Sequence, residues 1–321
     1  MMFVFSDDYF QDEVRQGFLV PGYMKRVWAS TIKVLENVDK ACEALGITYF
    51  ADSGTLLGAV REKGMIPWDN DVDIAMTRKD YDILEANFEK VFPKGYALVG
   101  NRGTSAVLHP YIGMPRIMNS LSVTISDEWL SENYGCPFPL GVDISILDEF
   151  PEDPGLRDTI FGFTQLILFT ISSQTLHPGE EDTLKNLAAI ESLSGKKFDK
   201  KKDILIQLET LYEDIVKTVR PSEAKCYVLW SNCCYHDALD RVWKKELFKK
   251  KRVPFETGDI IMPEGFEDIL ISYYGKDYMI PPKNKVSDHT FLDLYIEGLK
   301  DYLKKNGDPG FNTLKALGIP V

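Results

Sequence analysis

The sequence predicts an α+β fold in which a half of mixed helices and strands is followed by a mostly helical half. Apolar residues recur at spacings of three and four in several long segments, a pattern typical of helices that pack on one face. Short apolar runs bounded by glycine, proline or polar residues lie between these segments in the first half, and they are typical of strands. Pro151 and Pro154 punctuate the change, so we expect two regions, residues 1–155 and residues 156–321.

The elements of the first half follow in order from local signals. A helix is expected over residues 21–44, because its apolar positions form one face and Gly46 follows as a stop signal. Thr77 is expected to cap a later helix that ends before Pro93, since Asp80 three residues on completes a capping-box variant. The other expected elements of this half are a strand at 46–52, a short helix at 55–62, and strands at 70–76, 95–100, 114–119, 122–126 and 141–150.

The second half shows mainly helical periodicity. After the charged linker at 195–203, one helix carries an apolar stripe that consists of Ile204, Leu208, Leu211, Ile215 and Val219. The most apolar helix candidate, residues 159–172, is too short and too interrupted to span a bilayer. The other expected elements of this half are a strand pair at 252–265 and helices at 266–275 and 289–305.

The composition and charge of the chain exclude several classes of protein. The chain has 321 residues and a formal net charge of −12, which opposes non-specific binding to nucleic acid because a polyanion is repelled at long range. The five cysteines form no CxxC pair, so we expect reduced thiols rather than a disulfide framework or a zinc site. Residues 1–16 lack a basic leader and a long apolar stretch, and we therefore expect no signal peptide and a cytoplasmic protein.

Acidic side chains alternate with apolar ones where the chain enters the strand expected at 70–76. Successive side chains of a strand point to opposite faces, so Asp71 and Asp73 share a face while Val72 and Ile74 face the core. Two adjacent carboxylates repel each other, and a hard divalent cation between them relieves that repulsion. The pattern therefore indicates a metal–phosphate site; the alternative is a polar, solvent-exposed strand face.

Further features favour the metal site. Gly54 and Thr55 stand at a strand-to-helix turn, where a helix N-terminus offers free N–H groups to a phosphate. Pro67 and Trp68 break the segment before the acidic strand. Asp143 enters a second apolar strand and can supply a third carboxylate, which is the arrangement expected for metal-assisted phosphoryl transfer.

The stretch YFADSGTLLGAVREKGMIPWDNDVDIAMTRKDY, residues 49–81, closely resembles the LicD family, which includes the fukutin-related transferases. The segments VDISILDEF and MPEGFEDILISYYGKDYMIPP resemble that family to a lesser degree. The resemblance implies a nucleotidyltransferase-like fold, a small mixed sheet flanked by helices, with a catalytic core in the first region and a second region that completes the substrate site. It matches Asp71 and Asp73 to the metal-binding pair and Asp143 to the third acid. Asn70 stands where many members have an aspartate, so we expect it not to be an essential ligand.

Members of the family transfer a phospho-alcohol group, such as phosphocholine or ribitol phosphate, from a CDP-activated donor to a glycan or glycolipid hydroxyl. The resemblance thus implies transfer that depends on Mg²⁺ or Mn²⁺ and releases CMP, with such a donor and a glycan or lipid-linked saccharide acceptor as partners. Asp71 and Asp73 would hold the cation, and Asp143 would act as base or as shared ligand. Two alternatives remain open: a nucleotidyltransferase that passes an NMP group and releases pyrophosphate, and a degenerate nucleotide-binding module without catalysis.

Basic residues are the second group of site candidates. Arg61, Arg78 and Arg116 can clamp phosphate oxygens bidentately or form local salt bridges. His289 lies in a segment that resembles the family, and it is either a site residue or a helix-start histidine. The basic cluster at residues 244–252 is either a solvated face or a peripheral contact with anionic lipid.

Two other side chains have alternative roles. Trp68 can stack on a base or an alcohol group, although packing is the favoured role. Asp148 is either an acid that supports the site or a turn former before Glu149, and the turn is the favoured role.

Overall fold

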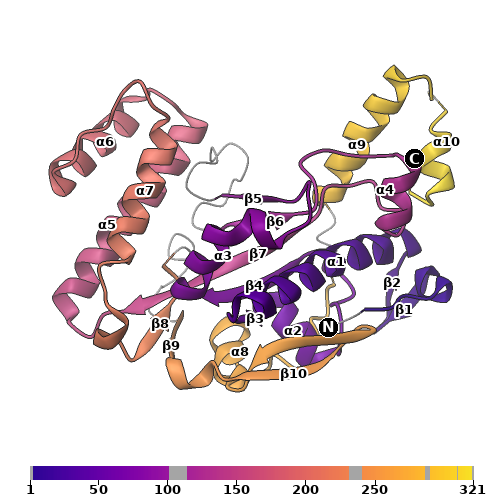
Figure 1. Ribbon diagram of the computed structural model, residues 1–321, viewed down its shortest axis with the longest axis horizontal. Coiled ribbons are helices and arrows are strands. Elements are labelled where there is room, and N and C mark those ends of the chain that lie inside the picture. Colours follow the sequence, from indigo (N-terminus) through magenta and orange to yellow (C-terminus); the bar gives the residue numbers. More distant parts are fainter. Residues whose placement is uncertain (1–2, 101–113, 231–240, 286–289, 309, 320–321) are drawn as a thin grey trace.

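The computed structural model describes residues 3–100, 114–230, 241–285, 290–308 and 310–319. Helices and strands alternate through its first half, and helices are the longer elements of its second half (Figure 1). The helices are α1 (Gly22–Leu45), α2 (Ser53–Arg61), α3 (Arg78–Val91), α4 (Asp127–Glu132), α5 (Pro154–Leu176), α6 (Glu181–Ser194), α7 (Ile204–Val216), α8 (Phe266–Tyr274), α9 (Thr290–Lys305) and α10 (Asn312–Ala316). The strands are β1 (Glu13–Arg15), β2 (Phe18–Val20), β3 (Tyr49–Ala51), β4 (Val72–Thr77), β5 (Ala97–Val99), β6 (Arg116–Met118), β7 (Gly141–Phe150), β8 (Cys226–Val228), β9 (Val242–Lys244), β10 (Lys250–Phe255) and β11 (Gly258–Pro263).

In the described parts of the chain, seven strands form one mixed sheet around β4 and β7. The strand order is β3-β4-β7-β6-β5, and β8 and β9 extend the sheet from the far end of β7. β4 and β7 run parallel, whereas the other described pairs in this sheet are antiparallel. The N-terminal ends of β4 and β7 therefore lie side by side, which is where the acidic side chains predicted from the sequence enter these strands.

Helices and hairpins cover the sheet from different elements. α1 and α3 contact each other, and both contact β4 and β7. α2 contacts β3, β4, α8 and the hairpin of β10 and β11, and β11 also lies against β3 at the edge of the sheet. The turn that precedes α2 is thereby surrounded by elements from both halves of the chain.

The described residues form two hydrophobic cores, and β7 contributes to both. The larger core combines the first half of the chain mainly with residues from 243 onward, and Ile144 and Ile146 belong to it. The smaller core lies within residues 160–230, and Phe150 packs against it. Figure 1 shows α5, α6 and α7 as a group beyond the C-terminal end of β7. The division of the chain at residue 155 stays a prediction.

The predicted α+β fold, with a mixed sheet flanked by helices, is confirmed. Thr77 caps α3 as predicted, because its hydroxyl accepts a hydrogen bond of 3.2 Å from the Asp80 N–H. The strand predicted at residues 122–126 is wrong, since these residues lie outside the strands and Ser126 instead caps α4. Ser120 and Ser122 bond to each other through side chain and backbone, and such local bonds compete with a strand ladder.

Two other findings concern cysteines and membranes. Cys42 and Cys136 are buried free thiols and Cys226 is a half-buried one, whereas Cys233 and Cys234 lie outside the described residues. Within the described ranges, no helix has both the length and the apolarity that crossing a bilayer requires. The cytoplasmic location stays a prediction.

Candidate active site

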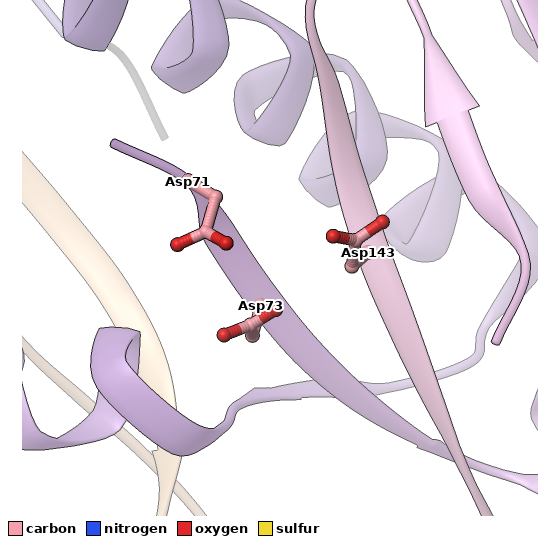
Figure 2. A group of neighbouring side chains, drawn as sticks. All are labelled: Asp71, Asp73 and Asp143. Atoms are coloured by element: carbon pink, nitrogen blue, oxygen red, sulfur yellow. The ribbon is translucent and has the colours of Figure 1, made fainter. Parts of the chain in front are cut away.

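Three carboxylates converge from the parallel strands at the centre of the sheet (Figure 2). Asp73 on β4 pairs in register with Asp143 on β7, and Asp71 lies two residues before Asp73. One carboxylate oxygen from each of the three lies within 4.8 Å of the others. The parallel pairing therefore joins acids that are seventy residues apart in the sequence, and it brings together the three residues predicted to hold a metal ion.

The alternation of side chains along the two strands explains why the carboxylates share one face. Val72 and Ile74 on β4, and Val142 and Ile144 on β7, are fully buried in the larger core. Their acidic neighbours must then point to the opposite face. There Asp71 and Asp73 are half-buried and Asp143 is 7% exposed.

The electrostatics of the cluster favour binding of a cation. Burial, the charge of Asp69 and its hydrogen bond, and the charge of Asp143 raise the pKa of Asp71 well above its ordinary value. Burial and the charges of Asp71 and Asp143 raise the pKa of Asp73 in the same way. A hard divalent cation offsets such repulsion, and carboxylate oxygens are the ligands it prefers. The donor set therefore fits a metal ion of the Mg²⁺ or Mn²⁺ type.

Arg116 is part of the carboxylate cluster. It lies on β6 directly across from Asp143, and its guanidinium donates two hydrogen bonds to the two oxygens of that carboxylate. Burial would lower the pKa of Arg116, but the hydrogen bonds and charge of Asp143 raise it above the ordinary value. The salt bridge considered from the sequence is thus present, and its partner is the third acid of the site.

The turn before α2 supports the acidic strand. The Thr55 hydroxyl accepts a hydrogen bond of 2.8 Å from the main-chain N–H of Asp73. A Cβ atom on Gly54 would lie 2.5 Å from an oxygen of Asp69, so a side chain there would displace the Asp69 carboxylate. Asp52 is the N-cap residue of α2, but its side chain makes no capping hydrogen bond, so it does not pair with the N–H groups of Gly54 and Thr55.

Arg78 and Asp148 form a separate buried ion pair. The Arg78 guanidinium donates to both Asp148 oxygens, at 2.7 and 3.1 Å, and to Glu213 on α7 at 3.1 Å. Asp148 lies within β7, paired with Val228, and it is 2% exposed. The favoured turn role for Asp148 is therefore wrong, because the strand continues through it to Phe150. The hydrogen bonds of the Arg78 guanidinium therefore connect α3 to β7 and α7.

Arg61 and Trp68 lie at the other end of α2. In the described part of the chain, the Arg61 guanidinium bonds to Glu62 and to the main-chain oxygen of Tyr278, and it lies 5.7 Å from the Trp68 ring centroid. Trp68 packs edge-on against Phe18, which agrees with its favoured packing role. These contacts do not join Arg61 to the three aspartates. His289 lies outside the described residues.

The basic cluster at residues 244–252 is only partly available to solvent. Phe248 packs against the rings of Phe50 and Tyr227, with centroids 5.5 Å away in each case. Arg252 donates to both oxygens of the buried Asp39. Lys249, Lys250 and Lys251 are exposed. A contact with anionic lipid stays a prediction, and Phe248 does not contribute to it as an exposed side chain.

Sequence reasoning missed a polar layer beside the carboxylates. Asp52 is 3% exposed, and burial raises its pKa although the Ser145 and Tyr273 hydroxyls oppose the shift. The Tyr273 hydroxyl donates to Asp52 at 2.9 Å. The next residue, Tyr274, is 44% exposed, and burial followed by the charges of Asp52 and Asp73 raises its pKa. An acid directly before a strand-to-helix turn is a signal that could have indicated Asp52, whereas the tyrosines come from a helix more than two hundred residues away.

Comparison with known proteins agrees with this geometry. Residues 46–105 match the family model described as LicD/FKTN/FKRP, nucleotidyltransferase domain. The chain is 27% identical over 270 residues to the lipopolysaccharide cholinephosphotransferase LicD of Haemophilus influenzae, a match that covers 83% of this chain and 95% of that protein. An uncharacterised protein of Rickettsia typhi is 34% identical over 77 residues, which cover 23% of this chain and 24% of that protein. An uncharacterised protein of Rickettsia prowazekii is 34% identical over 65 residues, which cover 20% of this chain and 23% of that protein. The predicted resemblance to the LicD family is thereby confirmed.

Proposed function

We propose that this chain is a metal-dependent transferase of the LicD type, which moves a phospho-alcohol group from a CDP-activated donor to a hydroxyl of a glycan or glycolipid. The cluster of Asp71, Asp73 and Asp143 is the observation that carries the reaction class. The relative named as a lipopolysaccharide cholinephosphotransferase supports phosphocholine as the transferred group and a lipid-linked saccharide as the acceptor. The proposal places the chain in the biosynthesis of cell-surface glycans.

The reaction exchanges one phosphorus–oxygen bond for another. The acceptor oxygen forms a bond to the phosphorus that carries the alcohol, the bond from that phosphorus to the bridging oxygen breaks, and CMP leaves. The proton of the acceptor hydroxyl passes to a base or to solvent. Asp71, Asp73 and Asp143 would hold Mg²⁺ or Mn²⁺, and such an ion, when bound, neutralises the negative charge of the pyrophosphate and of the departing CMP.

Asp143 serves better as a shared metal ligand than as the base. Both of its oxygens already accept hydrogen bonds from Arg116, and this pairing stabilises the ionised form. An acid held in that form is a weak proton acceptor but a good anchor for a cation. Arg116 in turn fixes the direction of the carboxylate, as supporting residues around metal sites commonly do.

Two features beside the cluster can bind the donor. The N-terminus of α2, at Gly54 and Thr55, carries N–H groups and the positive end of the helix dipole, which favour a phosphate. The half-exposed ring of Tyr274 offers a surface for the cytosine ring or for the alcohol group.

A binding screen followed by product analysis tests the proposal. Thermal stability is measured with CDP-choline, CDP-ribitol, CDP-glycerol and CMP, each with and without Mg²⁺ or Mn²⁺, because a ligand that binds the native state raises its stability. Turnover with a saccharide acceptor is then followed by CMP release. Stabilisation by a CDP-alcohol that requires the divalent ion, together with CMP release, supports the proposal.

The nucleotidyltransferase alternative is kept because the matched family model carries that description. Pyrophosphate release in place of CMP release would support this alternative. Absence of any divalent-ion binding would instead support the degenerate nucleotide-binding module.

A further inference from the structure

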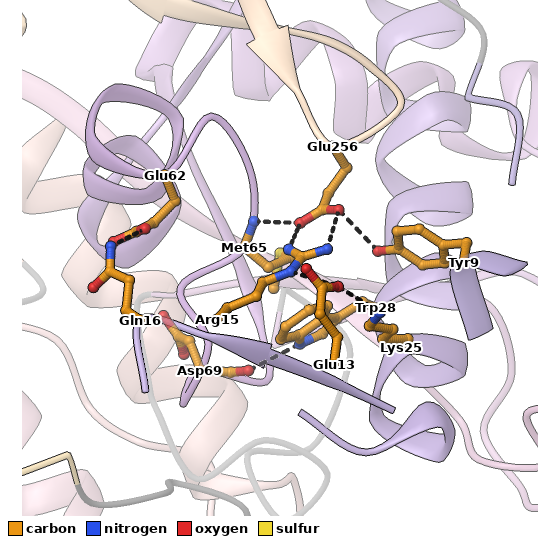
Figure 3. A network of polar contacts seen from close by, with 10 residues as sticks. All are labelled: Tyr9, Glu13, Arg15, Gln16, Lys25, Trp28, Glu62, Met65, Asp69 and Glu256. Carbon is orange, nitrogen blue, oxygen red and sulfur yellow. Dashed lines mark hydrogen bonds and ion pairs between the residues drawn. The ribbon is translucent and has the colours of Figure 1, made fainter. Parts of the chain in front are cut away.

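A buried glutamate outside the carboxylate cluster holds the segment that leads to Asp69 and to Asp71, which is one of the three acids of the cluster. Glu256 lies in the turn between β10 and β11, and its side chain is 3% exposed. Its carboxylate accepts hydrogen bonds from Tyr9 at 3.0 Å, from Arg15 at 2.7 and 3.2 Å, and from the main-chain N–H of Met65 at 2.8 Å (Figure 3). One side chain thus joins the N-terminal elements, the second-half hairpin and the segment between α2 and β4.

Two hydrogen bonds connect Glu256 directly to the segment between α2 and β4. The Glu256 N–H donates to the main-chain oxygen of Lys63 at 2.8 Å, while its carboxylate holds the N–H of Met65. The turn of the hairpin is therefore bonded on both sides of Gly64. A Cβ atom at Gly64 would lie 2.4 Å from a Glu256 oxygen, so a side chain there would push the two apart. Residues 62–71 leave this point and lead to Asp69 and Asp71.

The second connection reaches the end of the same segment through an aromatic ring. Arg15, held by Glu256, lies 5.3 Å from the centroid of the Trp28 ring. The indole N–H of Trp28 donates to the main-chain oxygen of Asp69 at 2.9 Å. Figure 3 shows these residues side by side, with Glu256 on one side of Arg15 and Trp28 and Asp69 on the other. The Asp69 end of the segment is thus held by Trp28, whose ring contacts the arginine that pairs with Glu256.

The backbone at Glu256 indicates that the side chain, not the turn, explains the choice of residue. Glu256 has a φ of +49°, which is a left-handed conformation that costs a residue with a side chain on the order of 1 kcal/mol relative to glycine. A tight hairpin turn alone would favour asparagine or glycine at such a position. The turn itself does not favour glutamate, but the glutamate carboxylate accepts hydrogen bonds from the Met65 N–H and the Arg15 guanidinium.

We propose that Glu256 is a positioning residue for the metal-binding carboxylates, which sets the path of residues 63–71 and thereby the placement of Asp69 and Asp71. The inference rests on the proposed metal-dependent function. It adds a role for the second half of the chain: the β10–β11 hairpin contributes no ligand, yet it sets where Asp71 lies relative to the ligands Asp73 and Asp143.

Glu256→Gln tests the proposal by metal affinity rather than by turnover. The amide keeps the size of the side chain but removes one of the two charges that hold Arg15, the other being that of Glu13. We expect the dissociation constant for Mn²⁺ alone, measured by calorimetry, to rise about tenfold or more, as is typical when a residue that orients a ligand is lost. An unchanged dissociation constant overturns the proposal while leaving the proposed function intact, and a wild-type protein that binds no divalent ion overturns both.

Arg252→Gln is the matched control. Arg252 lies on the same hairpin and pairs with the buried Asp39 of α1, at 2.8 and 3.0 Å, so its loss also takes an arginine away from a buried carboxylate. Its described polar partners, Asp39 and Asp259, lie outside residues 62–71. We expect a comparable loss of thermal stability with an unchanged Mn²⁺ affinity. If both variants lose affinity in proportion to stability, Glu256 has only a structural role.

Hydrogen exchange of the wild-type protein gives a test that does not require the variant to fold. Coupling between two sites is reciprocal, so an ion bound at the carboxylates must stabilise the Glu256 bond to Met65. We expect saturating Mn²⁺ to slow exchange of the Met65 amide more than that of the Val253 amide, which lies in the ladder of the same hairpin. Equal effects on the two amides, or none on Met65, contradict the proposal.

Discussion

At the scale of single residues, Asp71 and Asp73 lower the stability of the apo protein, because a metal site brings negative charges together. Their carboxylates lie together on a half-buried face, where burial and mutual repulsion raise the pKa of both. Replacing either by asparagine removes one negative charge without changing the shape of the side chain. The apo protein should therefore not lose stability, although the site loses a ligand.

The first prediction concerns Asp71→Asn and Asp73→Asn. Each should lower turnover by about 100-fold or more, since several kcal/mol of transition-state stabilisation depend on the held cation. The melting temperature without divalent ions should stay the same or rise, and its increase with Mg²⁺ should disappear. Calorimetric scans with and without Mg²⁺, together with rates, check this. Asn70→Ala is the control and should keep most of the activity; an equally deep loss there would mean that position 70 is also a ligand.

The second prediction separates two aspartates of β7. Asp143→Asn should reduce the catalytic rate far more than it weakens donor binding, because a shared metal ligand acts chiefly in the transition state. Asp148→Asn should instead destabilise the fold by roughly 3 kcal/mol, because it breaks a buried pair with Arg78. Rates and unfolding free energies measured on both variants check this. A large loss of rate in folded Asp148→Asn protein would place that residue in the site.

At the scale of elements, α7 carries a carboxyl group that makes stability depend on pH. Glu209 is 7% exposed, and among the described residues its Oε2 atom has no hydrogen-bond partner. Burial, followed by the charges of Asp203 and Glu213, raises its pKa from 4.5 to about 8. Between these two values the unfolded chain has lost the proton that the native state keeps, so the native state binds more protons and stability falls as pH rises.

The third prediction follows from this fall in stability with rising pH. The contribution of Glu209 should be fully present below pH 4.5 and should decline up to pH 8, by at most about 1.4 kcal/mol for each pH unit. Glu209→Gln removes the titration, so the variant should gain stability relative to the wild type across this range. Urea unfolding at several pH values measures the difference. A difference that does not change with pH would show that Glu209 is ionised in the native state.

Elements with a strong local signal could be predicted from the sequence, and elements held by distant partners could not. The strand at 141–150 and the cap at Thr77 are specified by adjacent residues, and both are confirmed. The strand expected at 122–126 is wrong because local serine bonds outweigh an alternating pattern. In the site, alternation along one strand predicted the shared face of Asp71 and Asp73. The roles of Asp52 and Glu256 depend on partners more than 150 residues away, which no local pattern contains.

At the scale of the whole molecule, the second half of the chain completes the core of the first. Residues such as Phe255, Ile260 and Leu270 are fully buried in the core that also surrounds β4. The hairpin that contains two of them covers β3 at the sheet edge. Without it, the apolar face of the first half would be exposed to water.

The fourth prediction is that a fragment of residues 1–155 does not fold to a native state on its own. Loss of the residues from 243 onward uncovers a large apolar surface, and it removes Glu256 and Arg252 from their buried partners. Such a fragment should show exposed hydrophobic surface and no fixed side-chain packing, as measured by dye binding and near-ultraviolet circular dichroism. A fragment with sharp tertiary signals would instead support an independent domain that ends at residue 155.

The two aspartates of β7 set a rule for how this chain can change over evolution. Asp143 and Asp148 are five positions apart, so they lie on opposite faces of the strand: one belongs to the carboxylate cluster, and the other anchors Arg78. Because side chains alternate with a period of two, inserting or deleting one residue between them would move one of the acids to the wrong face. Length changes inside this part of β7 can be tolerated only in pairs, whereas residues 151–153, which connect β7 to α5, are not bound by this period.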